Sequence, residues 1–180
     1  RHVLDVGLYG ELLTELGHLA PDLYIQITSE AAGTFTPAEQ RHLVDTLKPD
    51  AVSVALREIT AQQDAAVTRR FFAMCAEAKI DVQHILYDAA DIAHLARLVA
   101  QGDVPRDGLK TLIVLGRYTS GQTSTPEDVG ALAQTLKSAL PQVDWAACAL
   151  GPQETACLIE AMRHGGKTRI GFENNRLSAD

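Results

Sequence analysis

Short apolar runs that suit β-strands alternate along the chain with longer segments of helical periodicity. The runs start at roughly thirty-residue intervals, which is about the length of one strand–helix unit with its loops. Because they are nearly continuous in apolar residues, we expect a parallel sheet covered by helices. The six predicted strands are Leu23–Thr28, Ala51–Leu56, Val82–Tyr87, Thr111–Leu115, Trp145–Leu150 and Thr168–Glu173.

The segments between these strands carry start and stop signals of helices. Thr36–Glu39 has the pattern of a capping box with proline at the first helical position, and Thr125–Asp128 repeats it. Gly102 and the pair Gly165-Gly166 stand where a helix commonly ends in a left-handed residue. Between the strands, Asp88–Gln101 is predicted to form a helix with one apolar face.

Strict strand–helix alternation leaves two architectures, an open doubly wound sheet or a closed (β/α)8 barrel. The glycine-rich nucleotide motifs GxGxxG and GxxxxGK[ST] do not follow the first predicted strand, which disfavours a nucleotide-binding open sheet. Polar residues instead follow successive strands, the face at which barrels carry their chemistry. They are Thr28-Ser29-Glu30, Arg57-Glu58, Tyr87-Asp88, Gly116-Arg117-Tyr118 and Glu173-Asn174-Asn175. We predict an α/β fold of the (β/α)8 TIM-barrel type, incomplete and showing about six βα units.

Composition restricts the partners and the compartment. The net charge is −7, from 16 Lys and Arg against 23 Asp and Glu, which argues against nucleic acid as a partner. Three cysteines without a CxxC pair favour a reducing, cytoplasmic environment. No apolar run approaches the ~18 residues that cross a bilayer, and no signal peptide is visible, so no membrane partner is expected. The sequence predicts a cytoplasmic, soluble enzyme or binding domain.

Five segments, in order and with matched spacing, carry a resemblance to a known family. They are Gln26–Gly33, Ser53–Glu58, Gln83–Tyr87, Leu115–Tyr118 and Gly165–Asn175. Together they resemble the β-keto acid cleavage enzymes, a family that includes 3-keto-5-aminohexanoate cleavage enzyme. The resemblance extends over essentially the whole chain.

The resemblance implies a zinc-dependent (β/α)8 barrel that converts a β-keto acid and acetyl-CoA into acetoacetate and a new acyl-CoA. It also implies a homo-oligomer, a tetramer in the family. Family members hold zinc by a His-x-His pair on an early strand and a glutamate on the last strand, which maps onto Glu173. No His-x-His occurs in this sequence. We therefore expect that pair upstream of Arg1, in a single domain over residues 1–180 that lacks its first two βα units and its last helix.

The same motifs imply the remaining site residues. The family's catalytic arginine maps onto Arg169, and hydroxyl-bearing catalytic residues map onto Ser29 and Ser53. Thr28, Glu30 and Arg117 are the expected substrate-binding residues. Period-two alternation along the last predicted strand would place Arg169 and Glu173 on one face. A guanidinium there could bind a carboxylate bidentately or stabilise an enolate.

Asn174 occupies the remaining catalytic position that the resemblance implies, where some family members carry an aspartate that relays protons with the arginine. An amide cannot take up a proton near neutral pH, so either Arg169 is tuned differently in this subgroup or another group, such as Glu30 or Glu58, takes up the proton. A change of Asn174 to Asp is expected to keep or raise activity.

Structural interpretations stay open beside the catalytic ones. Thr28 and Ser29 also suit a turn cap, and Ser53 could simply pack within a strand. Glu30 and Glu58 could form ion pairs with Arg57 or Arg117. The strand histidine, His84, is favoured as a core residue over a metal ligand.

Two other functions remain open from the sequence. One is a metal-binding or structural barrel fragment without turnover, which the missing histidine pair and Asn174 favour. The other is a zinc aldolase or lyase that uses no CoA. Dependence on acetyl-CoA separates this lyase from the acyltransferase, and metal content separates both enzymes from the structural fragment.

Overall fold

The computed structural model describes residues 3–175, in which helices and strands alternate. The strands are β1 (Gln26–Thr28), β2 (Ala51–Ala55), β3 (Asp81–Leu86), β4 (Lys110–Leu115), β5 (Asp144–Ala149) and β6 (Lys167–Thr168). The helices are α1 (Val6–Leu19), α2 (Pro37–Leu47), α3 (Leu56–Ile59), α4 (Ala65–Glu77), α5 (Ala89–Ala100), α6 (Pro126–Ala139) and α7 (Glu154–Arg163), with a short 3-10 turn η1 (Ser120–Gln122).

The strands form one six-stranded sheet in the order β1-β2-β3-β4-β5-β6. The pairs β1–β2, β4–β5 and β5–β6 are parallel. This confirms the predicted α/β class with parallel strands in sequence order. The chain divides into two compact units, and their boundary falls within β3. One unit comprises the residues up to His84 together with Leu98–Asp107, and the other comprises Ile85–Arg97 and the residues from Gly108 onward.

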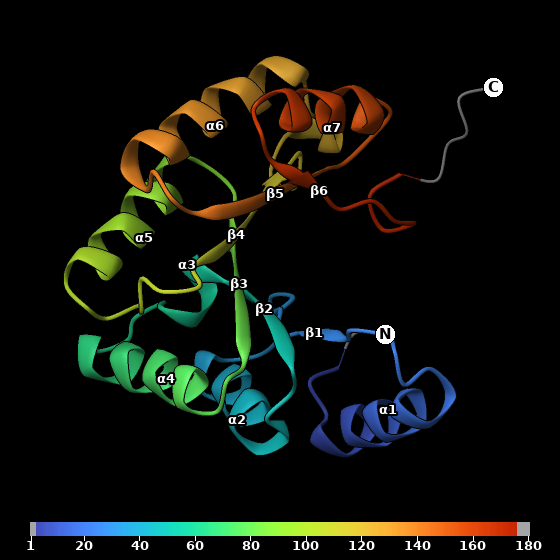
Figure 1. The fold of residues 1–180 in the computed structure, drawn as a ribbon, viewed down its shortest axis with the longest axis vertical. Coiled ribbons are helices and arrows are strands. Elements are labelled where there is room, and N and C mark those ends of the chain that lie inside the picture. Colours follow the sequence, from blue (N-terminus) through green and yellow to red (C-terminus); the bar gives the residue numbers. More distant parts are fainter. Residues whose placement is uncertain (1–2, 176–180) are drawn as a thin grey trace. The chain divides into compact units, whose positions relative to one another are not determined.

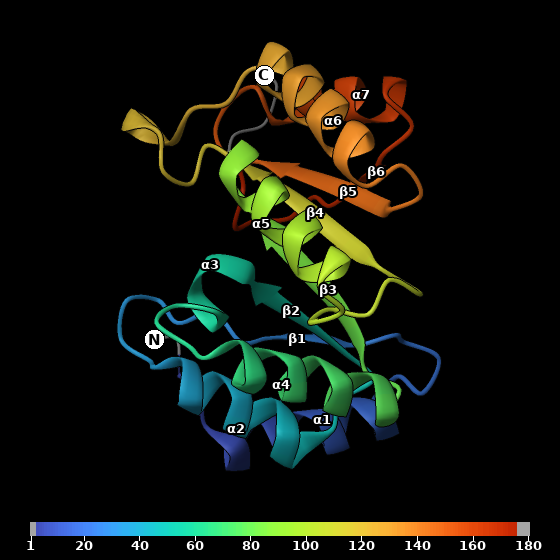
Figure 2. The same cartoon turned by 90° about the vertical axis from the view of Figure 1, so that its left-hand side faces the viewer.

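In the first unit, a fully buried β2 lies next to β1 and helices pack beside them (Figure 2). Helix α2 contacts α1, α3 and α4. The apolar core includes Leu43 and Val44 of α2 and Phe72 of α4. A close-packed apolar core of this kind holds β1 and β2, which carry or precede the predicted site residues Thr28, Ser29, Glu30 and Ser53.

In the second unit, β4 and β5 are buried along nearly their whole length, and α6 and α7 pack together beside them (Figure 1). Helix α7 also contacts β5 and β6. The core includes Ile113 of β4, Ala147 of β5 and Leu136 of α6. This packing fixes the ends of β5 and β6, and the predicted site residues Arg169, Glu173 and Asn174 follow β6.

The helix signals in the sequence are confirmed. Thr36 and Thr125 each accept a hydrogen bond from the third helical residue and receive the reciprocal bond, which completes both capping boxes. Gly102 and Gly165 have φ of 74° and 75°, the left-handed conformation expected at a helix end. Local signals were sufficient here because both partners of each cap lie within four residues.

The predicted strand limits hold for the four middle strands within one residue, whereas the first and last differ. β1 begins only at Gln26. Leu23 still belongs to the turn after α1, where its N–H donates to the Ala20 carbonyl at 3.0 Å, and both Leu23 and Tyr24 are exposed. The prediction of a last strand over Thr168–Glu173 is wrong beyond its start, since β6 ends at Thr168.

The chain leaves the sheet after Arg169, whose N–H makes one more bond to the Ala147 carbonyl at 2.9 Å. The Asn174 N–H then donates to the Gly171 carbonyl at 3.0 Å and closes a turn. Glu173 therefore lies in a turn, and the alternation argument that placed it on the same strand face as Arg169 does not apply.

Candidate active site

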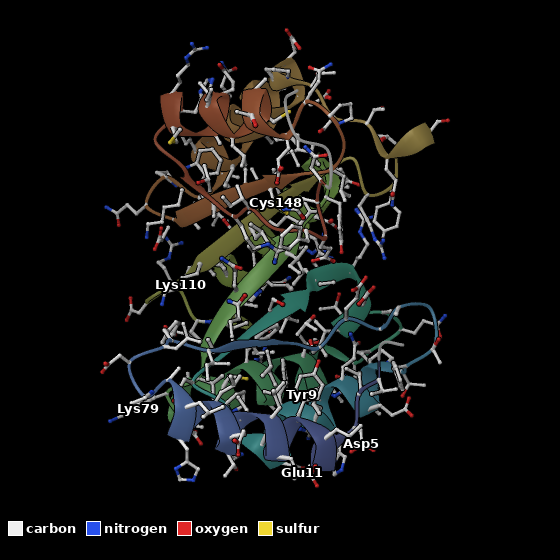
Figure 3. All side chains as sticks on the ribbon, turned by 90° about the vertical axis from the view of Figure 1, so that its right-hand side faces the viewer. Asp5, Tyr9, Glu11, Lys79, Lys110 and Cys148 are labelled. Carbon is white, nitrogen blue, oxygen red and sulfur yellow. The ribbon has the colours of Figure 1, made fainter. Side chains whose placement is uncertain are left out.

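Arg169 is anchored on β5 by its backbone and by its side chain. Beyond the backbone bond to Ala147, its Nη2 donates to the Cys148 sulfur at 3.5 Å. Cys148 is fully buried on β5 and is labelled in Figure 3. The guanidinium is thus held at the carboxyl end of β5, the edge at which parallel α/β enzymes carry their chemistry.

The pKa of the Cys148 thiol depends on its burial and on the charges around it. Burial raises its pKa, Arg169 lowers it, and the nearby carboxylates of Glu173 and Glu154 raise it. Of these charged groups, Arg169 also donates a hydrogen bond to the Cys148 sulfur. A raised pKa keeps Cys148 a thiol near neutral pH, so it suits an apolar anchor better than a nucleophile.

Asn174 joins three segments of this unit. Its Nδ2 donates to Glu154 Oε1 and to the Arg169 carbonyl, both at 3.3 Å. Its own carbonyl accepts the Gly151 N–H at 3.1 Å. Asn174 is only 8% exposed, so these contacts satisfy an otherwise buried amide. Asn174, which was predicted to act in catalysis, therefore connects the start of α7 to the residue after β6 by hydrogen bonds.

Glu154 and Gly151 belong to this cluster, and the sequence analysis did not identify them. Glu154 is the first residue of α7 and is 8% exposed, which is unusual for a carboxylate. Gly151 has φ of 91°, and a Cβ there would lie 2.8 Å from the Gln122 carbonyl. An acidic residue in the first turn of a helix is common because it complements the helix dipole, so its position does not distinguish Glu154 as a site residue.

Glu173 is exposed in the turn that follows β6. Within residues 3–175, no group of three His, Cys, Asp or Glu side chains could hold a metal ion. Carboxylate oxygen is an accepted zinc donor, so Glu173 fits as one ligand of a site with three protein ligands. The described residues provide that single donor.

The first unit brings together the hydroxyl residues after β1 and within β2. Ser29 donates through both its N–H and its Oγ to the Ser53 carbonyl, each at 3.1 Å. Ser29 is fully buried and Ser53 is 4% exposed. Thr28 Oγ1 accepts the Glu30 N–H at 3.1 Å, which is the turn-capping geometry. The Ser29 hydroxyl therefore bonds to the backbone of β2, and the Thr28 hydroxyl bonds to the backbone just after β1.

Glu58 holds the loop that follows these residues. Its Oε2 accepts the Ala31 N–H at 2.8 Å and the Gln40 Nε2 at 3.2 Å. The same Gln40 nitrogen donates to the Ser29 carbonyl at 2.5 Å. Gln40 is fully buried on α2 and was not selected from the sequence, where a glutamine on a helix carries no signal. Glu58 has a clear role in fixing the Ser29–Ala31 backbone.

The loop after β4 carries Arg117 and Tyr118 on the surface of the second unit. The Tyr118 ring packs edge-to-face on Tyr87, which follows β3, with centroids 4.8 Å apart. The two strand-end segments are therefore in contact. This places Arg117 next to an aromatic pair.

His84 lies in the core, as favoured from the sequence. It is 3% exposed, and its ring centroid is 5.1 Å from that of Phe72. Burial lowers its pKa to about 4, so the imidazole is neutral near pH 7. Among the described residues, its Nδ1 has no hydrogen-bond partner.

A family model for β-keto acid cleavage enzymes matches residues 1–180. The chain belongs to the β-keto acid cleavage enzyme family. The family assignment made from the five sequence segments is thereby confirmed. In the part of the chain that the structure describes, no helix is long and apolar enough to cross a membrane.

Solved structures resemble the chain in fold. An apo structure of ObcA matches with a TM-score of 0.70 and 11% identity, over 97% of this chain and 46% of that one. A binary complex of ObcA with oxaloacetate matches with 0.65 and 10%, over 97% and 47%. A 3-dehydroquinate dehydratase from Geobacillus kaustophilus HTA426 matches with 0.66 and 14%, over 97% and 68%. The likeness supports an incomplete TIM-barrel-like fold, and the chain spans about half the length of ObcA.

Proposed function

We propose that the protein is a zinc-dependent acyltransferase that converts a β-keto acid and acetyl-CoA into acetoacetate and a new acyl-CoA. The observation that supports the proposal is the Arg169 guanidinium held against the sulfur of buried Cys148 at the end of β5, four residues before Glu173, in a chain of the β-keto acid cleavage family. A cation and a carboxylate at one strand end suit a reaction in which negative charge develops on a keto acid.

The proposed reaction balances without an oxidant or a reductant. The carbon between the keto and carboxylate groups loses a proton, and the resulting enolate attacks the thioester carbonyl of acetyl-CoA. The carbon–sulfur bond breaks and releases the CoA thiolate. The thiolate then attacks the original keto carbon, and the carbon–carbon bond to it breaks. Acetoacetate takes up the proton, and the original acyl group leaves on CoA.

Arg169 is the residue we assign to the negative charge of this reaction. Its guanidinium is preorganised by the bonds to Ala147 and Cys148, so little reorganisation is needed when charge develops. A bidentate contact with the substrate carboxylate would also orient the keto acid.

Glu173 is the residue we assign to zinc, with two further ligands supplied from outside the described residues. When bound, zinc would supply Lewis-acid polarisation of the keto oxygen. Exposure of the Glu173 carboxylate leaves it accessible to a metal ion. Asn174 would hold the turn that carries it.

The residues of the first unit are assigned to shaping the substrate site. Ser29 and Ser53 would fix the end of β1, and Thr28 and Glu30 would border the substrate there. In the second unit, Arg117 is the remaining assigned substrate contact. We also propose a homo-oligomer, a tetramer as in the family, that acts in the cytoplasm on small molecules.

Isotope transfer tests the proposal. The full-length, zinc-loaded protein is incubated with acetyl-CoA carrying carbon-13 at its carbonyl and with a panel of β-keto acids. Oxaloacetate is included because ObcA was solved with it and because its keto group lies β to one carboxylate. We expect labelled ketone carbon in acetoacetate, together with an equimolar new acyl-CoA.

Each other outcome names a different function. Cleavage at the same rate without acetyl-CoA would identify a CoA-independent aldolase or lyase. No cleavage of any β-keto acid above the enzyme-free rate would leave a metal-binding or structural protein and would overturn the proposal.

A further inference from the structure

We infer that Glu154 is a positioning residue for the reaction proposed above: it holds the Asn174 amide, and Asn174 in turn holds the backbone of Arg169. This inference rests on the proposed function for its catalytic meaning. Its structural content stands on the second unit alone.

The Glu154 carboxylate is buried against Asn174. Glu154 and Asn174 are each 8% exposed, and the Asn174 Nδ2 lies 3.3 Å from Glu154 Oε1. A buried carboxylate is costly unless it accepts hydrogen bonds. Glu154 also begins α7, where the helix dipole favours a negative charge. The Asn174 amide and the helix start therefore both stabilise the charge at this position.

The Asn174 side-chain amide is a donor that an aspartate could not replace. An amide nitrogen has two hydrogens, and Asn174 directs them to Glu154 and to the Arg169 carbonyl. An aspartate at 174 would have no hydrogen to donate when ionised and would face the Glu154 carboxylate. The identity of residue 174 is thus matched to a carboxylate at 154.

Asn174 also connects Glu154 to Arg169, whose guanidinium is assigned to the developing negative charge. The Arg169 carbonyl is held by Asn174, and its N–H is held by Ala147. Because both the N–H and the carbonyl of Arg169 are hydrogen-bonded, its backbone is fixed, and its side chain donates to the Cys148 sulfur. Loss of the Asn174 contact would free one side of Arg169, and a displacement of about 1 Å can cost 100-fold in rate.

A thermodynamic cycle on the full-length protein tests the pair independently of activity. The variants are Asn174→Asp, Glu154→Gln and the double variant. We expect Asn174→Asp to lower the urea midpoint, because two carboxylates then face each other. Adding Glu154→Gln restores one donor with reversed direction, so the double variant should be more stable than Asn174→Asp. Strictly additive changes would show that the two residues are not coupled and would overturn the inference.

Two further readouts test the effect on Arg169. The NMR signal of the Arg169 Nε–H, assigned by its absence in Arg169→Lys, should move or broaden in Glu154→Ala and return towards its wild-type position in Glu154→Gln. Turnover with acetyl-CoA and a β-keto acid should fall about ten- to hundredfold in kcat in Glu154→Ala, with KM changed little. Glu154→Gln keeps an acceptor oxygen and should recover most of that loss. Glu160→Gln, on the same helix, is the matched control.

The failures are distinguishable. An unchanged Arg169 signal in Glu154→Ala, or an equal change in Glu160→Gln, would overturn the positioning role whatever the activity. An altered signal with unchanged kcat would overturn it for catalysis and leave the proposed function standing. A lack of turnover in the wild-type protein would refute the proposed function, while the cycle and the signal would still decide the pair.

Discussion

Glu173 and Arg169 carry opposite charges at one end of the second unit, and the two side chains have different surroundings. Glu173 is exposed in a turn, whereas Arg169 is half-buried and bonded to Cys148. An exposed carboxylate contributes little to folding and is accessible to a metal ion. A fixed guanidinium suits the stabilisation of charge at a defined place.

We predict that Glu173→Gln removes stoichiometric zinc from the full-length protein. A neutral amide oxygen is a weaker zinc ligand than a carboxylate. Zinc per protomer should be measured by elemental analysis after dialysis, with Glu77→Gln, exposed at the end of α4, as the control. Full zinc content in Glu173→Gln would exclude this residue as a ligand.

The contact between Asn174 and Glu154 changes one expectation drawn from the sequence. From the family pattern alone, Asp at position 174 should be tolerated or beneficial. In the structure, a carboxylate there would face Glu154 and release the Arg169 carbonyl. We now expect Asn174→Asp to lower stability and activity unless Glu154 is changed as well.

At the scale of elements, the turns after the strands are shaped by close packing as well as by hydrogen bonds. Gly166, between α7 and β6, has no room for a side chain, because a Cβ would lie 2.6 Å from the Trp145 ring. Trp145 is buried on β5, so its ring cannot easily move away.

We therefore predict that Gly166→Ala destabilises the protein by about 1–3 kcal/mol, the usual cost of overpacking. Urea unfolding measures the change. Gly17→Ala is the comparison, since a Cβ in α1 meets nothing within 4 Å and alanine favours a helix. Equal free energies of unfolding for Gly166→Ala and wild type would show that the Trp145 ring can move aside without destabilising the protein, which would contradict the prediction.

The cap of α6 gives a second prediction at this scale. Thr125→Ala removes the side-chain bond to the Asp128 N–H and should cost about 1 kcal/mol. Thr135→Ala, in the same helix, loses only a bond to the carbonyl four residues earlier and should be neutral or slightly stabilising. The two unfolding midpoints should differ in that direction, and coincident midpoints would contradict the role of the cap.

The elements differ in how far the sequence could predict them. The capping boxes and the middle strands depend on residues a few positions apart, so local patterns were sufficient. The turn after β6 depends on Gly151 and Glu154, about 20 residues earlier, and the loop after β1 depends on Glu58, 27 residues later. Contacts of this range are set by tertiary packing. Glu154 and Gln40 take part only in such contacts, so no local pattern distinguishes them, whereas Arg169 lies within a continuous segment of the family motif.

At the scale of the whole molecule, buried His84 makes stability depend on pH. Burial lowers its pKa from 6.5 to about 4. Between these two pH values, the imidazole is protonated in the unfolded chain and neutral in the folded protein. The free energy of unfolding should therefore fall as pH drops from about 6.5 to 4, by ~3 kcal/mol at most.

We predict that His84→Gln flattens this dependence, because glutamine does not titrate. Urea unfolding at pH 7 and pH 4.5 measures the loss in each protein. The exposed His42→Gln should retain the wild-type dependence. An equal loss in wild type and His84→Gln would mean that other groups carry the acid sensitivity.

The central claim is that Arg169 stabilises the charge that develops during acyl transfer from acetyl-CoA. Its most direct test is the turnover of zinc-loaded Arg169→Lys, measured as acetoacetate released from a β-keto acid and acetyl-CoA. Lysine keeps the charge and loses the bidentate geometry, so kcat should fall by about 10²–10³, with zinc content and unfolding midpoint unchanged. Lys167→Arg, an exposed change two residues earlier, should keep wild-type turnover. Wild-type acyl transfer by Arg169→Lys would show that the arginine is structural and would contradict the account.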